Sequence, residues 1–167
     1  MILLTNKTLQ YLIYNQLYSA GVYELLATQA PTEILQTQMK LFQQDSLNNA
    51  SYLDRYYQEL NTSSYNPIVR EPVNHGSFKK NVYWMLEYEG TNTCIFVDES
   101  FNGQNDASIK SLTAYISSSI DRRNTKLTNI YLNILDNEIA NNKKTSITRC
   151  LLHLVRATGI EPARRRR

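Results

Sequence analysis

Apolar residues recur at intervals of three and four along four stretches of the chain, which is the spacing of one face of an α-helix. In the first stretch, residues 6–29, this apolar line is Leu9, Leu12, Ile13, Leu17, Ala20, Tyr23 and Ala27. In the second, residues 32–60, it is Leu35, Met39, Phe42, Leu53, Tyr56 and Leu60. Ala30-Pro31 separates the two stretches, and Thr32 is a suitable N-cap for the second helix. The pattern predicts a pair of antiparallel neighbouring helices.

The second half of the chain predicts another pair of helices. Residues 61–76 contain Pro67, Pro72 and many turn-forming residues, and they predict a long crossover loop. Residues 77–100 have an apolar line of Phe78, Val82, Met85, Leu86, Phe96 and Val97, and Gly103 predicts a glycine C-cap. Residues 105–141 have a line of Ile109, Leu112, Ile116, Ile120, Leu127, Ile130, Ile134 and Ile139. Two helical hairpins joined by a long crossover predict an all-α, antiparallel four-helix bundle.

Charge divides the chain into a domain at residues 1–144 and a basic tail at residues 145–167. The domain holds 12 Lys and Arg against 14 Asp and Glu, whereas the tail holds six Arg and one Glu. We therefore expect no nucleic-acid binding by the domain. The tail predicts a poorly ordered segment or a read-through extension, because Gly159-Ile160-Glu161-Pro162 resembles translation of the antisense strand of a transfer RNA gene. A basic tail that binds RNA or a membrane surface is the alternative.

Cysteine use and hydropathy favour a cytoplasmic protein. Cys94 and Cys150 are the only cysteines, too few for a disulfide framework or a zinc site. The apolar start of the chain, residues 1–4, is too short for the apolar region of a signal peptide, and no run of about 18 apolar residues occurs. We expect no contact with a membrane.

Two short motifs add a family resemblance that covers about residues 6–140. The first is Tyr23-x-x-Leu26-Ala27-x-x-Ala30-Pro31. The second, at the end of the next predicted helix, is Tyr57-x-x-Leu60-x-x-x-x-Tyr65-x-Pro67. Together they resemble the first hairpin of the rubrerythrin-like proteins, a bacterial group within the ferritin-like di-iron family. The resemblance implies a ferritin-like bundle with the long crossover between helices 2 and 3.

In that family, a Glu from the first and third helices and a Glu-x-x-His from the second and fourth hold two iron ions. The matching positions here are Gln16, Ser46, Asn49, Glu89, Ile120 and Arg123. Only Glu89 keeps a carboxylate, and a guanidinium does not ligate metal. The resemblance therefore implies a degenerate di-iron site in which these former ligand positions form a polar core. We expect Arg123 to pair with Glu89, and Gln16, Ser46 and Asn49 to supply the remaining hydrogen bonds. An unrelated four-helix bundle that tolerates buried polar residues is the alternative.

No catalytic or metal-binding residue is expected elsewhere. His75 and His153 are read as ordinary exposed residues, and no nucleophile motif or phosphate loop occurs. The leading hypothesis is a non-catalytic protein without a cofactor, with a structural or protein-interaction role in the cytoplasm or a spore coat. It would act as a homodimer or with a partner protein, without nucleic acid or membrane. A ferritin-like oxidoreductase with a residual iron site is the alternative, and a subunit that pairs with a metal-competent relative is a third.

Overall fold

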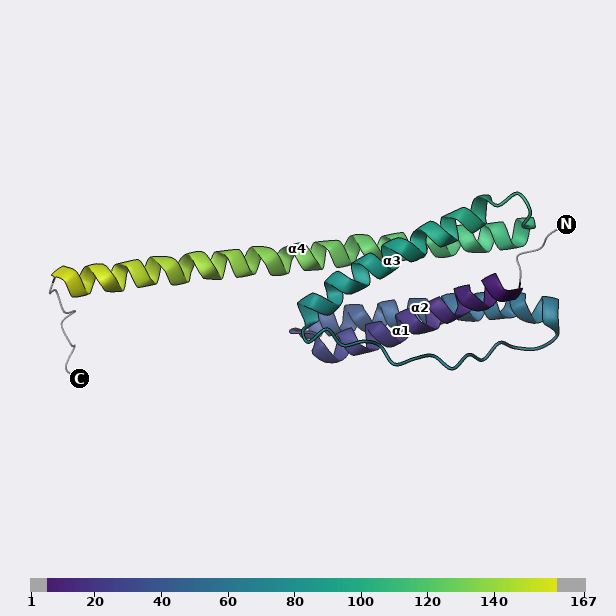
Figure 1. Ribbon diagram of the computed structural model, residues 1–167, viewed down its shortest axis with the longest axis horizontal. Coiled ribbons are helices and arrows are strands. Elements are labelled where there is room, and N and C mark those ends of the chain that lie inside the picture. The colour runs from purple at the N-terminus through teal and green to yellow at the C-terminus, as the bar shows by residue number, and fades with distance from the viewer. Residues whose placement is uncertain (1–5, 159–167) are drawn as a thin grey trace. The chain divides into compact units, whose positions relative to one another are not determined.

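The described part of the chain is all-α, as predicted. The computed structural model describes the backbone of residues 6–158 and the side chains of residues 6–145, and it contains no strand in that range. The helices are α1 (Asn6–Gln29), α2 (Glu33–Asn61), α3 (Phe78–Phe101) and α4 (Ala107–Thr158) (Figure 1). The bounds of α1, α2 and α3 agree closely with the predicted stretches, so the apolar periodicity located these helices correctly.

Side chains at the helix ends explain where the helices begin and stop. Thr32 is the N-cap of α2, and its hydroxyl accepts a hydrogen bond from the backbone N–H of Leu35 at 3.3 Å, as predicted. The predicted glycine C-cap at Gly103 is wrong. The C-cap of α3 is Asn102, with φ −60° and ψ 114°, and Asn105 Nδ2 donates to the Glu99 carbonyl at 2.9 Å. A side-chain donor therefore satisfies a terminal carbonyl that a left-handed glycine would otherwise have helped to satisfy.

The fourth helix is longer than predicted. It continues to Thr158 rather than ending near residue 141, because no Gly or Pro occurs between Gly103 and Gly159 to interrupt it. The first compact unit ends at Thr128, and a second unit begins at Asn129. The predicted domain boundary between residues 144 and 145 falls within α4, which spans Ala107–Thr158. The end of the tail, residues 159–167, lies outside the described residues.

The first compact unit packs α1, α2, α3 and the beginning of α4 around an apolar core. The apolar lines read from the sequence supply all of its buried members except Tyr57. These members are Leu9, Leu12, Ile13, Leu53, Tyr56, Tyr57, Phe96, Ile109, Ile116 and Ile120. Removal of these side chains from water is the main favourable term for a bundle of this kind. Leu60, predicted as an inward residue, is 38% exposed because it lies in the last turn of α2.

The segment between α2 and α3, residues 62–77, lies along α1 (Figure 1). The Arg70 guanidinium lies 4.9 Å from the ring centroid of Tyr18, and Gln29 Nε2 donates to Asn74 Oδ1 at 3.1 Å. A Cβ at Gly21 would lie 3.1 Å from Pro72 Cγ, so the absence of a side chain at Gly21 lets the segment pass close to the helix. The connection is thus held against α1 at several points.

His75, expected to be an ordinary exposed residue, is half-buried instead. Its ring stacks on Trp84 with centroids 5.4 Å apart, and its backbone N–H donates to Asn81 Oδ1 at 2.8 Å. The expectation failed because the sequence alone did not place Trp84 beside the loop. The side chain of His153 lies outside the described side chains. Within residues 6–158, no helix has the length and apolar character needed to cross a membrane.

Candidate functional site

A layer of polar side chains crosses the centre of the first compact unit. Each of the four helices contributes buried polar residues three or four positions apart, a spacing that places them on one helix face. The members of this polar layer are Gln16 and Ser19 of α1, Ser46 and Asn49 of α2, Glu89 and Asn92 of α3, and Ser119 and Arg123 of α4. Buried polar groups are costly unless they are hydrogen-bonded, so the contacts within this layer matter for stability.

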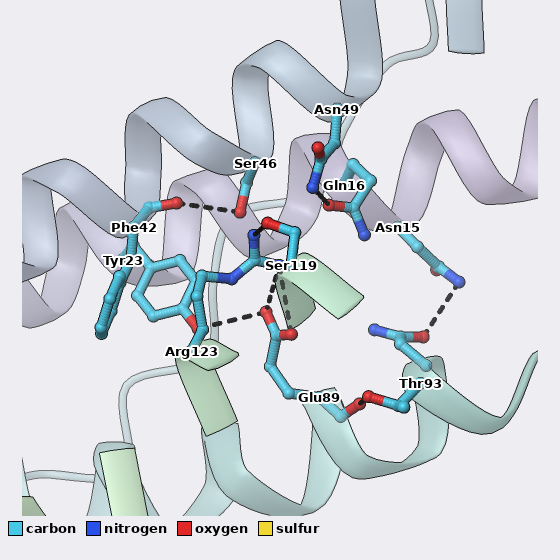
Figure 2. A network of polar contacts seen from close by, with 11 residues as sticks. Asn15, Gln16, Tyr23, Phe42, Ser46, Asn49, Glu89, Thr93, Ser119 and Arg123 are labelled. Atoms are coloured by element: carbon cyan, nitrogen blue, oxygen red, sulfur yellow. Dashed lines mark hydrogen bonds and ion pairs between the residues drawn. The ribbon is translucent and has the colours of Figure 1, made fainter. Parts of the chain in front are cut away.

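Glu89 and Arg123 form an ion pair at the centre of the layer (Figure 2). Arg123 Nη2 donates to Glu89 Oε1 at 3.1 Å and to Oε2 at 3.2 Å. The Glu89 side chain is 0% exposed and the Arg123 side chain 1% exposed, whereas the neighbouring Arg122 is exposed. The predicted contact between Glu89 and Arg123 is therefore confirmed, and so is the helix register on which it depended.

Tyr23 of α1 completes the surroundings of the carboxylate. Its hydroxyl donates to Glu89 Oε1 at 3.1 Å, and the Arg123 guanidinium carbon lies 5.7 Å from its ring centroid. The ring of Phe42 meets the Tyr23 ring edge-on, with centroids 5.4 Å apart. Burial, and then the charge of Glu89, raise the pKa of the Tyr23 hydroxyl well above its usual value, so it remains a neutral donor. The sequence reasoning assigned no such role to Tyr23, although the residue lies within the family motif.

Burial dominates the titration of the Glu89 carboxyl. Burial raises the pKa of Glu89 above its usual value, while Arg123 and then Tyr23 oppose the rise by stabilising the ionised form. Burial by itself lowers the pKa of Arg123 and is the largest single effect, but the charge of Glu89, Tyr23 and the hydrogen bonds to both residues together raise the net pKa. Arg123 therefore stays charged in the core. Its positive charge is the largest effect that favours the ionised form of Glu89.

The predicted hydrogen bonds from Gln16, Ser46 and Asn49 to the ion pair are not formed. Asn49 Nδ2 donates to Gln16 Oε1 at 3.1 Å, so the two amides pair with each other. The Ser46 hydroxyl donates to the Phe42 carbonyl of its own helix at 3.1 Å, a common outcome for serine within a helix. Ile120, placed by the sequence among the former ligand positions, lies in the apolar cluster and takes no part in the polar layer.

Residues that the sequence analysis did not name make further contacts within the layer and at its edge. Arg123 Nη1 donates to Ser119 Oγ at 3.5 Å, the limit for such a contact. Asn15 Nδ2 donates to Asn92 Oδ1 at 3.1 Å, and the Tyr88 hydroxyl donates to Asn15 Oδ1 at 3.2 Å. The sequence reasoning missed Ser119, Asn15 and Asn92. Asn92 could have been found, since it lies three residues after Glu89 on the same helix face.

The donor groups of this layer do not fit a di-iron centre. Such a centre uses four carboxylates and two imidazoles from the bundle core. The polar layer offers one carboxylate, already engaged by a guanidinium and a phenol, and no imidazole. Elsewhere among the described residues, no three His, Cys, Asp or Glu side chains come together in a group that could hold a metal ion.

Comparisons with known proteins add no relative: no model of a known protein family, no curated protein and no solved structure matches this chain. The ferritin-like family therefore stays a prediction from the motifs of the sequence.

Proposed function

We propose that this chain is a non-catalytic, ferritin-like protein whose degenerate di-iron site has become a polar core, and that it has a structural or protein-interaction role. The proposal includes the ferritin-like crossover between α2 and α3, and a place of action in the cytoplasm or a spore coat. The buried pair of Glu89 and Arg123 is the observation that supports it most strongly. The pair joins α3 and α4 at the two positions where the family resemblance implies metal ligands.

The balance of charge explains why the pair can take the place of a metal. A lone carboxylate at this depth would be desolvated and would take up a proton. Arg123 supplies the positive charge that ligands of iron would otherwise receive from the metal, and Tyr23 adds a hydrogen bond. The layer then crosslinks helices without a metal ion, as a rigid scaffold requires, and its one carboxylate is already engaged by Arg123 and Tyr23.

Exposed apolar side chains on α2 favour an interaction role. Ile34 is 82% exposed and Leu41 is 56% exposed, and with Glu33, Thr37 and Gln38 they line a groove of about 410 Å³. Large apolar residues in one open groove are typical of contact surfaces rather than of an isolated monomer. A homodimer and a separate partner protein are both compatible with this groove, and native mass spectrometry of the purified chain distinguishes them.

Iron analysis tests the proposal. The purified protein, reconstituted anaerobically with excess Fe(II), is expected to retain far less than stoichiometric iron and to show no peroxidase or ferroxidase turnover. Stoichiometric iron that is lost in Glu89→Leu would contradict the proposal and favour an oxidoreductase with a residual iron site. Glu87→Leu is the matched control, since Glu87 lies on the same helix and is exposed.

A further inference from the structure

Four buried polar atoms of the polar layer have no hydrogen-bond partner among the described residues. They are Gln16 Nε2, Ser19 Oγ, Asn92 Nδ2 and Arg123 Nε. Ser19 is near enough to lower the pKa of Glu89, and Asn92 that of Tyr88, but neither contact has the geometry of a hydrogen bond. Their side chains belong to residues that are at most 2% exposed, so bulk water does not reach them. Three of the four atoms are N–H donors, and the hydroxyl can either donate or accept. The layer therefore has an excess of donors over acceptors.

These atoms belong to the same part of the core. Gln16 and Ser19 are one turn apart on α1, and Asn92 is one turn beyond Glu89 on α3. Arg123 is the direct partner of Glu89. In Figure 2 the Gln16 amide turns its oxygen toward Asn49 and its nitrogen away from it. The unpaired atoms thus come from α1, α3 and α4, the three helices whose side chains meet at the Glu89 carboxylate.

Rotation of the side-chain amides changes which atoms are unpaired but does not pair all of them. If Gln16 and Asn49 both exchanged their nitrogen and oxygen positions, the unpaired atom of Gln16 would become its oxygen. The same exchange in Asn15 and Asn92 would leave the Asn92 oxygen unpaired and would also remove the acceptor of the Tyr88 hydroxyl. Arg123 Nε has no alternative assignment. With either assignment some buried polar atoms stay unpaired, so a molecule from outside the chain must supply hydrogen-bond partners if the layer is to be satisfied.

We propose that the polar layer binds a small cluster of ordered water molecules between Gln16, Ser19, Asn92 and Arg123. A water molecule accepts two hydrogen bonds and donates two, so it can bridge amide and guanidinium N–H groups to the Ser19 hydroxyl and the Glu89 carboxylate. A halide ion would also accept from these donors, but it would add a second negative charge beside Glu89, whose own charge already balances Arg123. The inference depends on the unpaired atoms alone and stands whether or not the chain is ferritin-like.

A crystal structure that resolves ordered water, from crystals soaked in bromide, tests this directly. The expected result is water oxygen density within about 2.7 to 3.2 Å of at least two of Gln16 Nε2, Asn92 Nδ2 and Arg123 Nε, without an anomalous bromide peak. A bromide peak in the layer would overturn the water cluster in favour of an anion site. A dry layer, with the donors re-paired to protein acceptors, would overturn it as well.

Oxygen-17 relaxation dispersion of water gives a solution test on the full chain. Long-lived water molecules are expected in the wild type, and Gln16→Met is expected to lose at least one of them. Gln44→Met is the matched control, because Gln44 is exposed and should leave the number unchanged. Ser19→Ala, a smaller change in the same layer, replaces Gln16→Met if that variant does not fold. A wild type with no long-lived water, or equal numbers in the layer variant and the control, would overturn the inference.

Discussion

Arg123 contacts both carboxylate oxygens of Glu89 through one nitrogen, Nη2, at 3.1 and 3.2 Å. The usual fork, in which two guanidinium nitrogens each donate to one oxygen, is not formed. The carboxylate therefore has room for a third residue, and the Tyr23 hydroxyl donates to Oε1. Side chains from α1, α3 and α4 meet at this one carboxylate, which makes it the central crosslink of the first compact unit.

Removal of the Tyr23 hydroxyl should weaken this crosslink. Tyr23→Phe keeps the ring packing against Phe42 but removes one donor to a buried charge, a loss of about 1.5 to 3 kcal/mol. Urea unfolding measures the change in the free energy of unfolding. Tyr11→Phe is the control, because Tyr11 is 50% exposed, and a change within about 0.5 kcal/mol is expected there. Equal values for the two variants would show that the Tyr23 hydrogen bond contributes nothing.

The loss caused by Arg123→Met should depend on pH. Burial raises the pKa of Glu89 in the folded state above its usual value of 4.5. The protonated carboxyl therefore favours the folded state, and this contribution to the free energy of unfolding is fully present below pH 4.5 and is lost as the pH rises through the folded-state pKa. Arg123 opposes this rise, so Arg123→Met should raise the pKa further. The deficit of Arg123→Met relative to wild type should therefore be larger at pH 8 than at pH 5 in urea unfolding. Arg122→Met, at an exposed position, should show no such trend, and a pH-independent deficit in Arg123→Met would refute the assignment.

Asp106 should stabilise the beginning of α4. Its Oδ1 accepts from the Ile109 backbone N–H at 2.9 Å, and its Oδ2 accepts from the Tyr56 hydroxyl at 2.6 Å. Asp106→Ala should cost about 1 kcal/mol of unfolding free energy, and Asp106→Asn, which can still cap, should cost less. The Tyr56 hydrogen bond is the main cause that lowers the pKa of Asp106 below 3.8. The contribution of ionised Asp106 to the free energy of unfolding is therefore present above pH 3.8 and is lost as the pH falls through the folded-state pKa. The loss of unfolding free energy in Asp106→Ala, measured against wild type by urea unfolding, should accordingly shrink in acid. A loss that grows in acid would contradict this role.

The contact between Gly21 and the 62–77 segment predicts a difference between two glycine variants. Replacement of a helical glycine by alanine gains about 0.8 to 1 kcal/mol from helix propensity. Gly90→Ala should gain most of this, since its new Cβ would lie 3.8 Å from the flexible Asn124 amide. Gly21→Ala should gain less, because its Cβ would lie 3.1 Å from Pro72 Cγ and the segment would have to shift. The measurement is the midpoint temperature of thermal unfolding of each variant relative to wild type. An equal increase in both variants would mean that Pro72 does not restrict a side chain at position 21.

Regular spacing predicted the helices, and the family resemblance selected Glu89 and Arg123 as former ligand positions that the same spacing places inward. Apolar residues three and four apart located α1, α2 and α3, and the same register placed Glu89 and Arg123 inward. Local signals were less reliable. Gly103 suggested a glycine C-cap, yet Asn102 and Asn105 end α3 through side-chain contacts that no spacing rule contains.

The partners of buried polar groups could not be predicted, because they depend on which amide or hydroxyl reaches which neighbour. Gln16 and Asn49 were expected to bind the ion pair, but they pair with each other, and Tyr23 takes the expected place. The end of α4 was misjudged for a different reason. The change of composition after residue 144 was read as a break, although the chain has no Gly or Pro between Gly103 and Gly159 to interrupt the helix.

A double-mutant cycle on Glu89 and Arg123 tests most directly whether their ion pair stabilises the centre of the bundle. Loss of one partner leaves an uncompensated buried charge, so Glu89→Leu and Arg123→Met should each lower the free energy of unfolding by about 3 kcal/mol. The double variant should recover much of that loss, because it removes both charges, which gives a large coupling energy in urea unfolding at neutral pH. Single losses that simply add in the double variant would contradict the account.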